Sequence, residues 1–358
     1  MQVNQKRLVN SFIKLVKIDS ESGEEKEIIS YLKKELQKFG FKTRIDKAGN
    51  LIGLKGSKPI IALSAHVDTV KPGKNIKPII TKSGLIKTDG STILGADDKS
   101  GVASIMEILQ TLKDNQEQVN LEIIFTVSEE TGLIGSSSLD FSKLKAKKAL
   151  NLDSGPGELL IGEPAIMQFD IEIIGKAAHA GMHPEDGINT VQIASEAISS
   201  LRWGRIDSET TSNVGVINGG ILRNVVPDKT TLQAEIRSRN KEKFKKYCQK
   251  LLEEFKKATK KYNGKINIKA VQRSQAFIID KKDLLVQSII KACKKNKVKP
   301  EPMLIGGNTD ANIFNVHNIK TITTGSCGKD IHLTKGSIMI KNLVVGTQIV
   351  LDTILSLK

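Results

Sequence analysis

Two glutamates, Glu129 and Glu130, stand side by side where the apolar segment IIFTVS, residues 123–128, comes to an end. A pair of adjacent carboxylates is most often part of a solvated loop, because charged side chains mostly lie at the surface. A chemical site is the alternative. The choice between them depends on which other residues the fold brings to the same place.

Two further stretches place acids and an imidazole at the ends of predicted strands. In SAHVDT, His66 and Asp68 are two residues apart, so an extended chain directs both to one face. An Asp beside a His is the usual device that fixes the tautomer of a metal-bound imidazole. In GADDKSG, Asp97 and Asp98 precede a helix, whose dipole favours anions. Helix capping explains one of these acids and leaves the other to be accounted for.

Two more candidate ligands follow later in the chain. Asp153 ends an apolar strand in NLDSG, and His332 lies in the glycine-bearing loop GSCGKDIHLT. Each residue alone has an ordinary explanation, as a core histidine, a helix cap, a turn or a loop. Together they lie at strand ends, where open α/β sheets bind ligands. Two mixed N/O sites that share one carboxylate would suit Zn, Mn or Co better than Ca or Mg.

The order of elements predicts two domains. Strand and helix signals alternate over 1–163, with a helix over 99–114, and predict an α/β catalytic domain with a mixed sheet and helices on both faces. The pattern changes over 164–273 to a βαββαβ unit, which we expect to be an inserted lid or dimerisation domain. Signals like those of the first part resume over 274–358, the second part of the catalytic domain.

Composition limits the class of protein. The net charge of +16 makes nucleic-acid binding a function that has to be considered. Only 8 of the 55 basic residues are arginine, however, and the lysines spread along the whole chain without a zinc finger or an aromatic RNA-binding motif. We therefore expect a lysine-rich surface and no specific nucleic-acid partner.

Membrane and redox signals are also missing from the sequence. No apolar run reaches the roughly 18 to 20 residues that span a bilayer. The first 20 residues have helical spacing instead of the apolar core of a signal peptide, so we expect a cytoplasmic protein. The three cysteines, Cys248, Cys293 and Cys327, are far apart and form no CxxC pattern. They predict neither a disulfide framework nor a cysteine-based zinc site.

The motifs together resemble the M20 metallopeptidase family over nearly the whole chain. The resemblance rests on SAHVDT, GADDKSG, SEETG, NLDSG, GKAAHAGMHPEDGIN, NVVPDKTTLQAEIRS and GGNTDAN. It implies two divalent metal ions, most readily Zn, with Co or Mn as alternatives. Asp97 would bridge them, Glu130 and His332 would complete one site, and His66 and Asp153 would complete the other.

The resemblance also implies roles for residues that bind no metal. Asp68 and Glu129 would be catalytic, and Glu129 would be the general base that takes the proton of the attacking water. In the inserted domain, His179 would stabilise the oxyanion, while Asn224 and Arg237 would hold carbonyl or carboxylate groups of the substrate. Relatives further imply a cis peptide between Asp97 and Asp98 and a homodimer formed through the inserted domain.

The branch of the family follows from smaller features. Position 153 is Asp, and in this respect the chain resembles the aminopeptidases and dipeptidases of the family. The stretch GGNTDANIFNVHNIKTITTGS resembles the corresponding stretch of the peptidase T branch. We therefore predict removal of the N-terminal residue from short peptides such as tripeptides. Lys335 and Gly336 stand where relatives carry an acidic residue, so a carboxypeptidase or an N-acyl-amino-acid deacylase is the alternative. A binding protein without catalysis is a further alternative.

Overall fold

The computed structural model describes all 358 residues and divides into two compact units. The first unit contains Met1–Ile161, Ile279–Leu304 and Asn308–Lys358, and the second contains Gly162–Ile278 with Ile305–Gly307. The sequence predicted an insertion at 164–273. The second unit covers this range and also includes a short segment, Ile305–Gly307, from much later in the chain.

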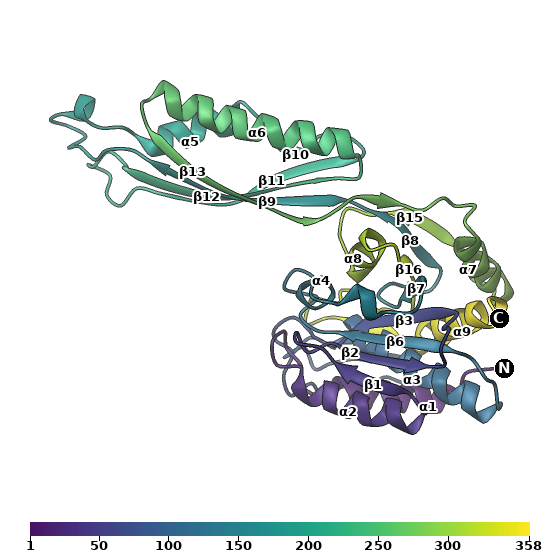
Figure 1. The fold of residues 1–358 in the computed structure, drawn as a ribbon. Coiled ribbons are helices and arrows are strands. Elements are labelled where there is room, and N and C mark those ends of the chain that lie inside the picture. The colour runs from purple at the N-terminus through teal and green to yellow at the C-terminus, as the bar shows by residue number, and fades with distance from the viewer. The chain divides into compact units, whose positions relative to one another are not determined.

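A mixed sheet forms the centre of the first unit (Figure 1). Its strand order is β1-β2-β6-β3-β7-β16-β8-β14, with β15 paired to β8. The pairs β3–β6, β3–β7 and β16–β7 are parallel, and β1–β2 and β2–β6 are antiparallel. The strands are β1 (Lys42–Ile45), β2 (Leu51–Lys55), β3 (Ile61–His66), β6 (Leu121–Thr126), β7 (Lys148–Asn151), β8 (Glu158–Glu163), β14 (Phe277–Ile278), β15 (Glu301–Leu304) and β16 (Lys320–Thr323).

Helices cover both faces of this sheet. On one face, Ile52 and Ile124 pack with Phe314 in a buried cluster. On the other face, a Cβ atom placed on Gly53 would lie 2.9 Å from the Leu36 side chain, so a helix packs closely there. The helices are α1 (Gln5–Val16), α2 (Lys26–Lys38), α3 (Ala96–Asp114), α4 (Ile134–Ser137), α7 (Leu284–Lys295), α8 (Asp310–Val316) and α9 (Ile340–Ser356). The predicted α/β domain with a mixed sheet is confirmed.

Amphipathic spacing explains why these helices form where they do. In α1, Leu8, Phe12 and Leu15 are fully or almost fully buried at intervals of four and three residues, and the Asn4 side chain caps the first turn. In α3, Asp97 and Asp98 have non-helical backbone angles, so the regular helix begins at Lys99. The peptide bond between Asp97 and Asp98 is cis, as the family resemblance implied.

Three parallel strands end at the same edge of the sheet. β3 ends at His66, β6 at Thr126 and β7 at Asn151. Because parallel strands deliver their carboxyl ends together, the segments that follow them meet there. This edge holds the candidate site.

A small sheet that the sequence did not predict supports the loop bearing His332. Its strands β4 (Ile79–Ile80), β5 (Leu85–Lys87) and β17 (Ser337–Met339) are only two or three residues long, which is too short for a periodic signal. The loop also closes on itself, because Lys329 pairs with Ser337. Thr88 Oγ1 donates a hydrogen bond to the carbonyl of Thr334.

The second unit is an antiparallel sheet with helices on one face. Its order is β10-β11-β12-β9-β13, and Phe169, Ile171 and Ile173 of β9 pack in one cluster with residues of both helices. The elements are β9 (Ala165–Ile174), α5 (Thr190–Ser199), β10 (Gly204–Arg205), β11 (Thr210–Gly219), β12 (Lys229–Ser238), α6 (Lys241–Lys261) and β13 (Lys265–Ser274). The βαββαβ prediction is confirmed, with the short β10 in addition.

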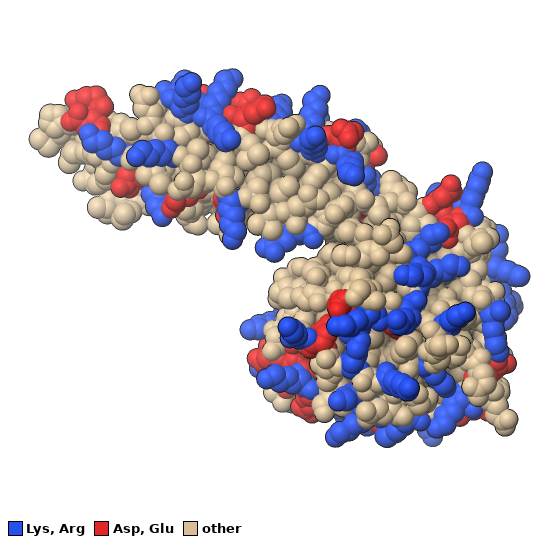
Figure 2. All heavy atoms as spheres, viewed as in Figure 1, with Lys and Arg blue, Asp and Glu red and all other residues tan.

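Charged side chains are dispersed over the face seen in Figure 2, where Lys and Arg outnumber the acids on both units and acids lie among them. None of the helices combines the length and the apolar character that crossing a membrane requires.

Candidate metal centre

Asp97 is the centre of the candidate site. His66 Nε2 lies 3.0 Å from its Oδ1, and His332 Nε2 lies 3.0 Å from its Oδ2. Asp97 is 6% exposed and His66 is 2% exposed. One buried carboxylate thus faces two imidazoles with its two oxygens, as a bridge between two metal ions would.

Asp68 fixes the geometry around this centre. Its Oδ1 lies 3.3 Å from His66 Nδ1, so the other ring nitrogen points to Asp97. The same carboxylate accepts hydrogen bonds from the backbone N–H groups of Glu129 and Glu130 and from Ser22 Oγ. Asp68 therefore orients both an imidazole and the loop that carries the two glutamates.

Glu129 and Glu130 have different surroundings, although they are adjacent. Glu130 Oε1 lies 3.1 Å from His332 Nε2, but it is buried and has no aligned hydrogen-bond partner. Glu130, His66 and Asp97 each offer one ligand atom, and these three atoms lie within 4.8 Å of one another. The Glu129 side chain is also buried, and its charge interacts with His66 and Asp97.

Asp153 approaches Asp97 from the end of β7. Asp97, Asp153 and Cys327 each offer one ligand atom, and these three atoms lie within 4.8 Å of one another. The family resemblance instead paired Asp153 with His66. Cys327 was not predicted to bind metal, because the spacing of the three cysteines shows no zinc-site pattern and its proximity to Asp153 depends on tertiary structure.

The pKa values of this cluster shift in ways that reveal a shortage of positive charge. Burial acts to raise the pKa of Asp97, but hydrogen bonds from His332 and His66 outweigh it and hold that pKa well below its ordinary value. Burial and then the Asp97 charge raise the pKa of Glu130 and, more strongly, of Asp153. Burial, with Asp310 and Glu130, raises the pKa of Glu129 well above its ordinary range.

The two imidazoles shift in the same direction. Burial acts against the charged form of His66, but contacts with Asp68 and Asp97 raise its pKa well above the ordinary value. The hydrogen bond to Asp97 is the main cause that raises the pKa of His332 to about 9. Protons thus supply the charge that the carboxylates need, and divalent cations would supply it better. The donor set and the orphaned Glu130 oxygen therefore fit a two-metal centre.

These shifts predict how the stability of the metal-free protein depends on pH. The pKa values of His66, His332, Glu129, Glu130 and Asp153 are higher in the folded chain than in the unfolded chain. Their stabilising contributions are complete below the unfolded pKa values and are lost as pH rises through the folded ones. For His332 the window runs from about 6.5 to about 9. Thermal unfolding of the chelated protein should therefore occur at lower temperature at pH 8 than at pH 6.

The zinc-loaded protein is the control for this prediction. Metal ligands must be deprotonated, so zinc affinity and the stability it adds rise with pH, and the slope should flatten or reverse. Above pH 8 the comparison becomes mixed, because burial lowers the pKa of Lys99 to about 8 and that group acts in the opposite direction. A chelated protein that becomes more stable between pH 6 and 8 would contradict this electrostatic account.

Sequence reasoning missed two buried acids beside the site. Glu25 Oε1 accepts hydrogen bonds from the backbone N–H and the Oγ of Ser128, and thus holds the residue before Glu129. Asp310 accepts from Thr126 Oγ1, and its charge acts on Glu129. Asp310 belongs to the GGNTDAN motif, which was a usable signal, whereas Glu25 had none.

His179, Asn224 and Arg237 all lie in the second unit. His179 and Asn224 are neighbours, since the Ala180 N–H donates to the Asn224 carbonyl at 3.0 Å and His179 pairs with Val225. Arg237 lies near the far end of β12, where it pairs with Glu235 at 2.8 Å and donates to the carbonyl of Gly306. Eight residues of strand from Lys229 to Arg237 span roughly 26 Å. The structure therefore separates Arg237 from the other two.

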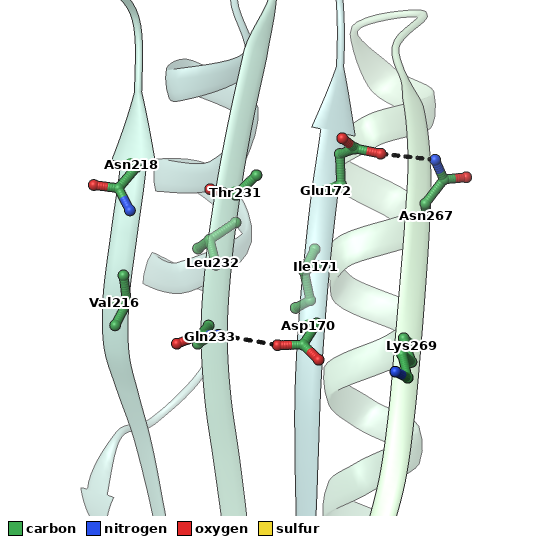
Figure 3. A pocket seen from close by; sticks show the side chains of 10 residues that line it. All are labelled: Asp170, Ile171, Glu172, Val216, Asn218, Thr231, Leu232, Gln233, Asn267 and Lys269. Atoms are coloured by element: carbon green, nitrogen blue, oxygen red, sulfur yellow. Dashed lines mark hydrogen bonds between the residues drawn. The ribbon is translucent and has the colours of Figure 1, made fainter.

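The helix-free face of the same sheet has a hollow of about 430 Å³ (Figure 3). Its polar side chains pair with one another: Gln233 donates to Asp170, and Asn267 donates to Glu172. None of the residues grouped around Asp97 lines it. We assign no catalytic role to this hollow.

Comparisons with known proteins place the chain in a family. Residues 161–263 match the peptidase dimerisation domain of the M20 type, and residues 50–161 match peptidase family M28. YqjE of Bacillus subtilis (strain 168) is 38% identical over 366 residues, which cover 98% of each chain.

Two solved structures share the whole fold. Aminopeptidase PepT from Bacillus cereus ATCC 10987 has 36% identity, coverage of 99% of each chain and a TM-score of 0.93. A tripeptidase from Staphylococcus aureus subsp. aureus Mu50 has 33% identity, coverage of 100% of this chain and 99% of that one, and a TM-score of 0.96. The chain is thus a peptidase that belongs to the M20 metallopeptidase family, in its peptidase T-like branch.

Proposed function

We propose that this protein is a two-metal aminopeptidase that removes the N-terminal residue from tripeptides and similar short peptides. The observation that carries the proposal is the geometry of Asp97, whose two oxygens face His66 and His332 while Glu130 and Asp153 approach it from two strand ends. The names of the two solved relatives, an aminopeptidase and a tripeptidase, support the substrate class.

Glu129 is the proposed general base. When bound, the two metal ions polarise the scissile carbonyl and make the attacking water more acidic. The Glu129 carboxylate takes a proton from that water and passes it to the nitrogen of the leaving amine. Asp68 holds the Glu129 backbone in place for this transfer, because its Oδ1 accepts the Glu129 N–H at 2.9 Å.

Residues of the second unit would bind the substrate. His179 would donate to the oxyanion that forms at the attacked carbonyl, and Asn224 would hold a neighbouring carbonyl. Arg237 would bind a carboxylate, for which its planar guanidinium is suited. In the free chain this charge is paired with Glu235, so a substrate carboxylate would have to compete for it.

Hydrolysis of one tripeptide in free, N-acetylated and C-amidated forms tests the proposal with zinc-loaded protein. We expect release of the first residue from the free and amidated forms and no cleavage of the acetylated form. A carboxypeptidase or deacylase is the second candidate, because Lys335 lies three residues after His332 in place of an acid and could bind a substrate carboxylate. Cleavage that tolerates acetylation and requires the free carboxylate would overturn the aminopeptidase assignment in favour of that candidate.

A homodimer would reconcile the separation of Arg237 from His179 and Asn224. An extended tripeptide spans only about 10 Å, so one copy cannot bring all three to it across roughly 26 Å of strand. We propose that one copy supplies Arg237 and the other supplies His179 with Asn224. The match of residues 161–263 to a dimerisation domain supports this arrangement.

Exposed apolar residues near His179 suggest how to test the dimer. Ile221 is 92% exposed, Leu222 is 62% exposed and Met182 is 69% exposed. They lie on the two loops that pair through His179 and Val225. The native chain should sediment as a dimer, and Ile221→Asp with Leu222→Asp should give a folded monomer with much lower activity. Leu284→Asp, at a 77% exposed position of α7, is the matched control. A native monomer with full activity would contradict the dimer.

A further inference from the structure

Cys327 lies in the candidate metal centre, although no pattern in the sequence predicted it there. Its Sγ, a carboxylate oxygen of Asp97 and a carboxylate oxygen of Asp153 all lie within 4.8 Å of one another. Ligands of one tetrahedral zinc ion lie roughly 3 to 4 Å apart, given metal–ligand distances of about 2.0 to 2.3 Å. Small side-chain movements would therefore bring all three atoms onto one ion.

The backbone holds Cys327 beside the Asp153 loop. The Cys327 N–H donates to the Ser154 carbonyl at 2.8 Å. Two residues earlier, a Cβ atom on Gly325 would lie 2.3 Å from the Leu152 carbonyl oxygen, so only glycine permits this close approach. The position of the cysteine is thus fixed by the fold.

The surroundings of the thiol lack both a good hydrogen-bond partner and positive charge. Sγ donates a long hydrogen bond to the Ala96 carbonyl, at 4.0 Å. Asp98 is fully buried, and its Oδ2 has no hydrogen-bond partner. The unpartnered Asp98 oxygen and the crowding of the Asp97 and Asp153 ligand atoms within 4.8 Å of Sγ both point to a missing cation.

We propose that Cys327 is a sulfur ligand of the metal ion that Asp97 and Asp153 hold. This inference rests on the proposed two-metal function and makes its metal more specific. Binding exchanges the Sγ–H bond for an Sγ–metal bond, and the proton is released to solvent. A thiolate is a soft ligand, so this position would favour Zn or Co over Mn.

X-ray absorption of the zinc-loaded wild-type protein tests the ligand directly, without a variant that could fail to fold. We expect a zinc–sulfur shell at about 2.3 Å in addition to the nitrogen and oxygen shell at about 2.0 to 2.2 Å. The cobalt-loaded protein should show a sulfur-to-cobalt charge-transfer band in the near ultraviolet. Both signals report the bond and do not depend on activity.

Variants identify which cysteine gives the signal. Cys327→Ser should lose the charge-transfer band and should bind the second equivalent of cobalt more weakly. Cys293→Ser is the matched control, because Cys293 is also buried in the first unit but lies on α7, away from the ligand groups. Its band should be unchanged.

The other outcomes separate the two proposals. Two bound metal ions with only nitrogen and oxygen neighbours, or a band that survives in Cys327→Ser, would overturn the role of Cys327 and leave the two-metal peptidase intact. Failure of the wild-type protein to bind zinc or cobalt at all would overturn the proposed function and, with it, this inference.

Discussion

Replacing Glu129 by glutamine should abolish peptide hydrolysis while leaving both metal ions bound. A general base contributes about 10² to 10⁴ in rate, so kcat should fall by at least this range with little change in KM. Glutamine keeps the size of the side chain, and the backbone N–H bond to Asp68 is unaffected. Metal content measured together with steady-state kinetics checks the prediction.

Glu130→Gln is the informative comparison. Glu130 is adjacent in sequence, but its carboxylate lies beside His332 and Asp97, where a metal ligand would lie. The variant should lose affinity for one ion as well as activity. Glu117→Gln, at a half-buried position before β6 where the carboxylate pairs with Lys358, should bind both ions and turn over as wild type. If Glu129→Gln kept wild-type kcat with two ions bound, the general base would have to be another group.

Replacing Asp97 by asparagine should remove both ions at once. Its two oxygens face the two imidazoles, so its replacement disturbs both sides of the site. Losing the Lewis-acid contribution of several kcal/mol should lower kcat/KM by at least about 10³. Direct metal analysis after dialysis, together with circular dichroism to verify folding, measures this effect.

Asp114→Asn is the matched control, since Asp114 is on the same helix but lies at its solvent-exposed end with Arg7. The control should retain two ions and full activity. If Asp97→Asn bound one ion with normal affinity, Asp97 would be a ligand of a single site and not a bridge.

Much of the fold could be predicted from periodicity and turn chemistry. The broad apolar face of 99–114 predicted α3, and the change in the order of strand and helix signals over 164–273 predicted the second unit. The strands β4, β5 and β17 were missed because two or three residues carry no alternation that can be recognised. The segment Ile305–Gly307 joins the second unit only through tertiary contacts, so no local signal marks it.

The candidate site was predicted at the level of residue types and strand ends. Strand ends and loops suggested these residue types, and the M20 resemblance selected the set His66, Asp97, Glu130, Asp153 and His332. The structure brings them around one carboxylate. Their individual metal roles remain proposals. Cys327 could not be found in this way, because it lies 174 positions after Asp153 and tertiary contacts, among them Gly325 against Leu152 and Cys327 N–H with Ser154, bring it close.

The separation of Arg237 from Asn224 was open to prediction and was overlooked. The two residues are 13 positions apart, with a predicted strand between them. A strand rises about 3.3 Å per residue, so its length already indicated that the two side chains lie far apart within one chain. The dimer that we propose rests on this separation.

The measurement that tests the account most directly is a titration of chelated protein with zinc, in which bound metal and release of the first residue of a tripeptide are followed together. We predict no hydrolysis by the metal-free protein, and activity that rises with bound zinc and levels off at two ions per chain. Hydrolysis that persists in fully chelated protein, or a protein with two bound zinc ions that leaves free tripeptides intact, would contradict the assignment as a metal-dependent aminopeptidase.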